Sequence, residues 1–213
     1  MRLNYIDYLK VIALLLMTFY HFRFASYLYS DSILTLADET IGFLARFLFL
    51  SLFGIHYSSY QNKFKTKFKK LLSASVLVSF ASYLFDPSNY IVWGVIHLFT
   101  LCAFIFRFIP KIIYLLGFIS IFSLFIDLPY LSHNLFMILG FTKSSFTSYD
   151  YFPIFPFFSY VFVGILSKDY VIKKGVLKRD LPPNVYVTRL AQNSLLYYLI
   201  HIPIILLVHY TMM

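Results

Sequence analysis

Long apolar runs separated by short polar stretches make up most of the chain. A helix needs about 20 apolar residues to cross roughly 30 Å of hydrocarbon, and seven runs are of this order. They cover residues 5–27, 36–60, 71–85, 90–106, 111–126, 152–167 and 188–210. The more polar stretch 127–151 contains residues 135–141, which we expect to form a short helix at the membrane surface. The pattern predicts an all-α integral membrane protein, a bundle of about seven transmembrane helices.

Composition supports this prediction. Of the 213 residues, 60% are hydrophobic and 13% are charged, against about 25% charged in an ordinary soluble domain. Seven crossings use most of the chain, so we expect residues 1–213 to form a single transmembrane domain. The runs are continuous rather than alternating, which disfavours an outer-membrane barrel. The single cysteine, Cys102, excludes an intramolecular disulfide.

The placement of lysine and arginine predicts the orientation, because loops rich in these residues stay in the cytoplasm. With the N-terminus in the cytoplasm and the C-terminus outside, 14 of the 18 basic residues lie on the cytoplasmic side. These are Arg2, Lys63, Lys65, Lys67, Lys69, Lys70, Arg107, Lys111, Lys168, Lys173, Lys174, Lys178, Arg179 and Arg189.

The net charge of +9 has two interpretations. Basic loops satisfy the topology rule and bind anionic lipid headgroups. Part of the charge could instead receive the phosphates of a nucleotide-bearing cosubstrate. Nucleic acid is a poor partner, because the basic loops are short and no recognition module is present.

Polar side chains inside the first predicted span are the first candidates for a site, since ionisable groups are costly in lipid. Asp7, Lys10 and His21 all lie there. Lys10 and His21 are eleven residues apart, almost three helical turns, so they share one helix face about 16 Å apart. This face would link the two sides of the membrane.

Other predicted spans contribute further polar residues. If these residues face inward, they form a chamber in which histidines move protons, a carboxylate orients a proton and an arginine holds an anion. The histidines are dispersed without compact ligand spacing, so we expect no metal. The candidates are Arg46, His97, Asn193, Ser194, His201 and, at the outer mouth of the sixth span, Asp150.

Several of these residues lie in segments that resemble a known family. The chain is similar, in the same order, to the heparan-alpha-glucosaminide N-acetyltransferase catalytic domain and its prokaryotic YeiB-like relatives, within the wider transmembrane acyltransferase superfamily. The similar segments are Ile6 to Lys10 with Met17 and His21, Arg46 with residues 49–55, Gly94 to Leu98, Asp150 to Pro156 with Gly164, and Asn193 to Pro203.

The resemblance implies transfer of an acyl group, acetyl being the expected one, from cytoplasmic acyl-coenzyme A to a hydroxyl or amine of a glycan across the membrane. It also implies a multi-pass protein of a prokaryotic plasma membrane, in contact with lipid. A homo-oligomer is compatible with it. For the catalytic residues His21, His97 and Asp150 we hypothesise that His21 is the base and that Asp150 or His97 orients the acceptor or the base. Arg46 would stabilise the developing oxyanion charge. The implied coenzyme-binding residues are Asp7, Lys10, Arg46, Asn193, Ser194 and His201.

Two alternatives stay open. The same buried charges would suit a small proton-coupled transporter or channel, although the inverted halves typical of transporters are not evident. A non-catalytic membrane subunit of the same fold is the other, because Lys10-Val11 and Ala191-Gln192 stand where the family usually has Arg-Gly and Gly-Arg. Lysine binds an anion but lacks the bidentate fork of arginine.

Overall fold

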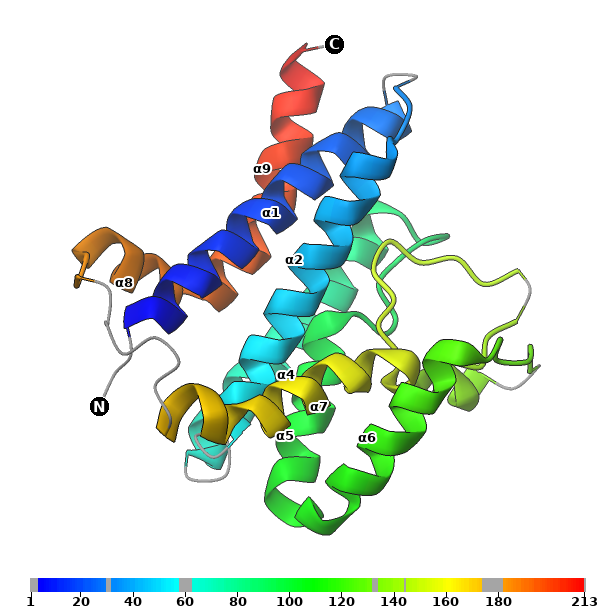
Figure 1. Cartoon of the computed structure of the whole chain (residues 1–213). Coiled ribbons are helices and arrows are strands. Elements are labelled where there is room, and N and C mark those ends of the chain that lie inside the picture. Colours follow the sequence, from blue (N-terminus) through cyan, green and yellow to red (C-terminus); the bar gives the residue numbers. More distant parts are fainter. Residues whose placement is uncertain are drawn as a thin grey trace. The chain divides into compact units, whose positions relative to one another are not determined.

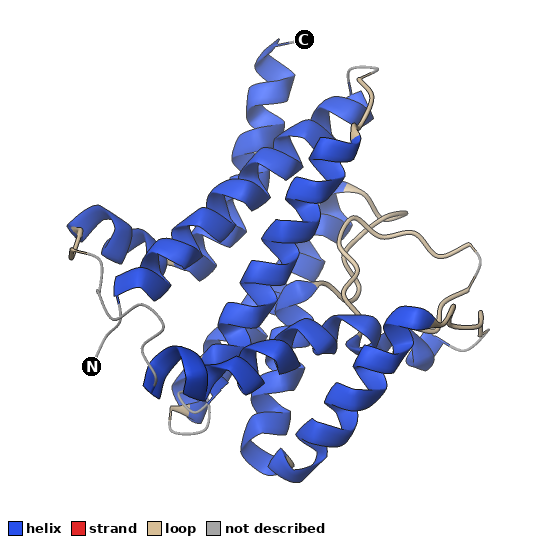
Figure 2. Ribbon diagram, viewed as in Figure 1, coloured by secondary structure: helices blue, strands red, loops and turns tan. Residues whose placement is uncertain are grey.

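The computed structural model describes residues 4–29, 32–57, 63–131, 134–143, 145–173 and 182–212. Its regular structure is helical throughout these ranges, apart from an isolated bridge between Trp93 and Tyr151 (Figure 2). The prediction of an all-α fold is therefore confirmed. Four basic residues assigned above to the cytoplasmic side, Arg2, Lys174, Lys178 and Arg179, lie outside the described residues.

The helices follow in the order drawn in Figure 1. They are α1 (Asn4–Tyr29), α2 (Leu36–Ile55), α4 (Phe64–Phe85), α5 (Val95–Phe108), η1 (Pro110–Ile112), α6 (Ile113–Phe122), η2 (Ser123–Phe125), η3 (Asn134–Ile138), α7 (Ile154–Lys173), α8 (Val185–Gln192) and α9 (Ser194–Met212).

The chain divides into two compact units. Unit 1 comprises residues 1–52 and 169–213, so α1 and most of α2 share it with α8 and α9 from the far end of the sequence. Helices α1 and α9 run side by side in the same direction (Figure 1). Their paired positions rise together, from Thr18 with Tyr197 to Ser26 with His209. This parallel pairing brings the first and last predicted spans together.

Unit 2 comprises residues 53–168 and contains α4, α5, α6 and most of α7. Phe106, Phe158 and Phe162 are fully buried there. Two glycines permit close contacts: a Cβ on Gly54 would collide with the backbone carbonyl of Val161, and a Cβ on Gly117 would collide with the Phe162 ring. At Gly54 the helix therefore packs directly against the backbone of α7, and at Gly117 the missing side chain leaves room for the Phe162 ring.

The chain is an integral membrane protein by its apolar helices. Among the described residues, α1 and α4 are each long and apolar enough to cross a membrane alone, and counting two sharply bent helix pairs as spans raises the number to four. One pair is α5 with residues 110–125, bent by 113°. The other is α8 with α9, bent by 82°. The number of about seven spans and the orientation stay predictions.

Several helix bounds differ from those predicted. The last span, predicted as continuous over 188–210, is broken at Asn193, whose Nδ2 and backbone N–H both donate to the Arg189 carbonyl at 2.8 and 3.1 Å. A local side-chain bond of this kind competes with helix continuation. The predicted surface helix at 135–141 is a 3-10 helix, Asn134–Ile138, that stops before Gly140 at a φ of 115°.

Three other helix boundaries differ from the prediction. Helix α2 ends at Ile55 rather than continuing to residue 60. Helix α4 begins at Phe64, seven residues before the predicted start, so the lysine-rich segment before residue 71 is part of the helix. Helix α5 begins at Val95 rather than at residue 90, since Gly94 and the residues before it are extended or turned.

Candidate functional site

Two predicted site residues meet directly in unit 1. His21 Nδ1 on α1 lies 2.8 Å from His201 Nε2 on α9. His201 is 3% exposed, and its Nδ1 lies 2.6 Å from the backbone carbonyl of Tyr198, one turn earlier on its own helix. The two imidazoles therefore form a histidine pair inside a helix interface, although 180 residues separate them in sequence.

The contacts of the pair define which nitrogens carry protons when both rings are neutral. A carbonyl oxygen only accepts, so His201 Nδ1 must donate to Tyr198. A neutral imidazole has one N–H, which leaves His201 Nε2 as an acceptor. His21 must then donate from Nδ1, and its lone pair lies on Nε2. In the neutral pair, the contacts of His201 therefore leave the free lone pair of His21 on Nε2.

A second polar contact lies beside the histidine pair. Thr18 Oγ1 is 2.8 Å from the Tyr197 hydroxyl and also 2.8 Å from the Leu14 carbonyl. Tyr197 and His201 are one turn apart on α9, and their rings are almost parallel at 7° with centroids 6.1 Å apart. Polar side chains of α1 and α9 therefore face each other over at least one helical turn around His21.

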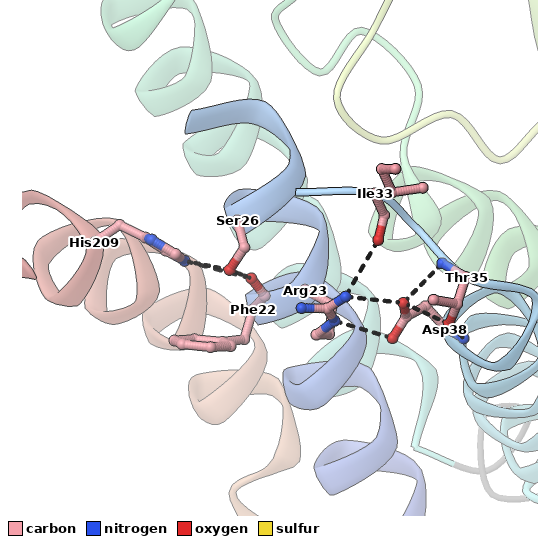
Figure 3. Close-up of polar contacts among 7 residues, drawn as sticks. All are labelled: Phe22, Arg23, Ser26, Ile33, Thr35, Asp38 and His209. Atoms are coloured by element: carbon pink, nitrogen blue, oxygen red, sulfur yellow. Dashed lines mark hydrogen bonds and ion pairs between the residues drawn. The ribbon is translucent and has the colours of Figure 1, made fainter. Parts of the chain in front are cut away.

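Further along the same two helices, a second histidine has a simpler environment. His209 Nε2 lies 3.3 Å from the Ser26 hydroxyl and 3.4 Å from the Phe22 carbonyl (Figure 3). Both contacts are to α1 itself, and His209 is buried. The arrangement ties the C-terminal ends of α1 and α9 together.

An ion pair holds the beginning of α2 against α1 in the same region (Figure 3). Arg23 donates from Nε and Nη2 to the two carboxylate oxygens of Asp38, at 3.1 and 3.3 Å, and from Nη2 to the Ile33 carbonyl at 3.2 Å. Asp38 also accepts from the backbone N–H and hydroxyl of Thr35. This bidentate pair fixes the connection between the first two helices of unit 1.

The predicted residues His97 and Asp150 lie in unit 2, where they hold the start of α5. His97 Nδ1 accepts from the Gly94 N–H at 3.2 Å, so the neutral ring donates from Nε2 to Ser79 Oγ at 3.0 Å. Asp150 Oδ2 accepts from the Val95 N–H at 3.0 Å. In the neutral ring both His97 nitrogens are engaged within unit 2, which favours a capping role.

A second carboxylate of unit 2 lies just after α4. Hydrogen bonds from Asn89 Nδ2, the Tyr149 hydroxyl and the Ser88 N–H lower the pKa of Asp86 below its usual value. These contacts connect the turn after α4 to the segment before α7. Nearby, burial raises the pKa of Tyr151 to about 12, so its hydroxyl stays a donor to the Met137 carbonyl at 2.6 Å.

The remaining predicted residues have varied positions. Asp7 is buried and Lys10 half-buried in the first turns of α1, on the helix that carries His21. Arg46 Nε donates to the Gly42 carbonyl on α2 at 3.2 Å. Asn193 and Ser194 form the break between α8 and α9. These residues all belong to unit 1, whereas His97 and Asp150 belong to unit 2.

Sequence reasoning did not identify Thr18, Tyr197 or the Arg23–Asp38 pair as part of this arrangement. A signal existed for the first two, since Thr18 is three residues before His21 and Tyr197 four residues before His201, the spacings of one helix face. Arg23 and Asp38 gave no such signal, because they lie on different helices. Within the described residues, no group of three or more metal-ligating side chains is arranged for an ion; the absence of a metal stays a prediction.

Fold and site together define the class: a helical integral membrane protein with a histidine pair between α1 and α9, the first and last helices of its described part. The chain belongs to the family described as heparan-alpha-glucosaminide N-acetyltransferase, catalytic, whose family model matches residues 2–203. The match covers both units and all predicted site residues, and it confirms the resemblance noted from the motifs. No curated protein and no solved structure is significantly similar to the chain.

Proposed function

We propose that the chain is a membrane acyltransferase that moves an acetyl group from cytoplasmic acetyl-coenzyme A to an amine or hydroxyl of an amino-sugar glycan on the other side. The family name supports acetyl transfer to a glucosaminide. The observation that carries the proposal is the His21–His201 hydrogen bond, because it leaves an unprotonated nitrogen on a side chain inside the membrane region.

In this mechanism His21 Nε2 accepts the proton of the acceptor's N–H or O–H as that group attacks the thioester carbonyl carbon. The new carbon–nitrogen or carbon–oxygen bond forms, the carbon–sulfur bond breaks, and the proton passes to the departing thiolate. The products are the acetylated acceptor and free coenzyme A. General bases of this kind contribute about 10²- to 10⁴-fold to rate.

His201 is a positioning residue in this scheme. It accepts the hydrogen bond of His21 Nδ1–H, and it stabilises the positive charge that develops on His21 during proton transfer. We assign the base to His21 rather than to His97, because His97 uses both nitrogens to hold the start of α5. Lys10 and Arg46 are the cations of unit 1 that we assign to the phosphates and the developing oxyanion.

We also propose that the protein crosses a prokaryotic plasma membrane about seven times, with its N-terminus in the cytoplasm. The excess of basic residues on one predicted side supports this orientation. A donor bound from the cytoplasm and an acceptor bound from outside would then meet at the α1–α9 interface.

The test uses purified full-length protein in nanodiscs, with acetyl-coenzyme A and glucosamine as the probe acceptor. Free coenzyme A is measured with a thiol-reactive dye. We expect acceptor-dependent release, reduced about 10²- to 10⁴-fold by His21→Ala. His209→Gln is the matched control, since the hydrogen bonds of His209 to described residues are with Ser26 and Phe22 on α1, away from the pair. No acceptor-dependent release, or full activity of His21→Ala, would contradict the proposal.

A further inference from the structure

The N-terminal end of α4 in unit 2 carries an unusual charge pattern. Lys63, Lys65, Lys69 and Lys70 are exposed there, and the first turn of the helix contains no acidic residue. A helix N-terminus has partial positive charge, which disfavours cations and favours acids. This end of α4 therefore concentrates positive charge that its own helix does not neutralise.

The end of α5 adds to this charge. The rings of Phe64 on α4 and Phe108 on α5 meet edge to face with centroids 5.1 Å apart, so the C-terminal end of α5 lies at the start of α4. Arg107 is exposed in that last turn. We call these five exposed basic residues, Lys63, Lys65, Lys69, Lys70 and Arg107, the basic collar. From residue 63 to residue 125 the only acid is Asp86, beyond the far end of α4.

Aromatic side chains accompany the basic collar. Phe64 stacks on Phe68 at 4.9 Å, and Phe104 lies 4.8 Å from Phe108, which is 57% exposed. Lysines combined with Phe and Leu side chains are typical of helical segments that lie between the hydrocarbon and the headgroups. The phenylalanine cluster therefore agrees with a position of this end of α4 at the membrane surface.

The length of α4 leads to the same position. Its apolar part, residues 71–85, spans about 22 Å at 1.5 Å per residue, which is less than the roughly 30 Å of hydrocarbon. Val76, Phe80 and Leu84 form an apolar face that is 60% or more exposed. For this face to lie in lipid, the lysine-bearing turns must lie at headgroup depth, where their ammonium groups extend toward phosphates.

We propose that the basic collar is a docking surface for anionic phospholipid headgroups in the leaflet at this end of α4. Phosphate would also be the recognised group of a soluble nucleotide. Depth favours lipid, because the aromatic rings and the short apolar segment place the lysines among headgroups. The proposal is independent of the catalytic function and of the histidine pair.

The test measures thermal unfolding of the full chain in a neutral detergent, titrated with phosphatidylglycerol or with phosphatidylcholine. We expect stabilisation at a lower concentration of phosphatidylglycerol. The combined variant Lys65→Gln, Lys69→Gln and Lys70→Gln should raise the half-maximal phosphatidylglycerol concentration by about five-fold for each lysine removed. Lys143→Gln, an exposed lysine of the 127–151 segment, is the matched control and should leave it unchanged.

Three results would overturn the proposal: equal stabilisation by both lipids, an unaltered preference in the triple variant, or displacement of phosphatidylglycerol by coenzyme A or inorganic phosphate. The last result would identify a soluble phosphate site instead. If the triple variant does not fold, the wild-type protein still decides the matter. Added salt should then abolish the preference for phosphatidylglycerol, and a preference that persists in high salt would contradict a charge-based surface.

Discussion

Replacing His201 with leucine tests the central step of the proposed mechanism. The substitution places an apolar side chain of similar length in a position that is 3% exposed, and it removes the acceptor for His21 Nδ1–H. Without that acceptor, no hydrogen bond to His201 holds the proton of the His21 ring on Nδ1 and the lone pair on Nε2. We expect the rate of acetyl transfer to fall while binding of acetyl-coenzyme A changes little.

The size of the effect follows from the lost hydrogen bond. A donor left unsatisfied in a buried site costs about 1–3 kcal/mol. If that cost falls on the transition state, where His21 carries the extra proton, it corresponds to a decrease in kcat of about 5- to 150-fold. The effect should be smaller than that of His21→Ala, since the base itself remains.

The assay is coenzyme A release at saturating donor and several acceptor concentrations, repeated across a range of pH. The dependence on acceptor concentration separates kcat from KM. His201→Gln is the matching variant, because its amide oxygen can accept the His21 hydrogen bond and should restore part of the rate. His209→Gln serves as the control on the same helix. If His201→Leu has the kcat and the pH profile of the wild type, the positioning role is wrong.

Three further predictions concern stability and topology. Gly54→Ala should lower the free energy of unfolding by about 1–3 kcal/mol or more, because the added methyl group meets a backbone carbonyl. Gly42→Ala should lower it less, because its methyl group meets a tyrosine ring that can turn. Thermal unfolding in detergent compares the two variants. Asp86 has a folded pKa below its unfolded value, so its contribution to stability is complete above pH 3.8 and is lost as the pH falls through the folded pKa. The difference in unfolding temperature between wild type and Asp86→Asn should shrink over that acidic range, and a constant difference would count against it. In a variant without the native cysteine, an impermeant maleimide added outside intact cells should label Lys143→Cys and not Lys70→Cys; the reverse pattern would invert the predicted orientation.

The sequence predicted well those features that depend on local pattern. Apolar runs of about 20 residues are constrained by the bilayer itself, so the first span predicted at 5–27 corresponds closely to α1 (Asn4–Tyr29). The break at Asn193 was missed, because a straight helix and a bent helix can have the same apolar sequence pattern. Only the hydrogen bonds of Asn193 to the preceding turn decide between the two.

For the candidate site too, the sequence predicted some features and only the structure showed others. Residue type and helical spacing were enough to select His21 and His201 from the sequence, and the family match confirms the kind of protein they belong to. That the two rings share a hydrogen bond, and that His97 instead caps the helix on which it lies, depended on the packing of helices far apart in sequence. The composition determined a helical membrane protein because lipid excludes unpaired backbone groups. Tertiary structure alone decided which nitrogen of His21 carries the lone pair, because a tautomer is set by the partners on either side of the ring.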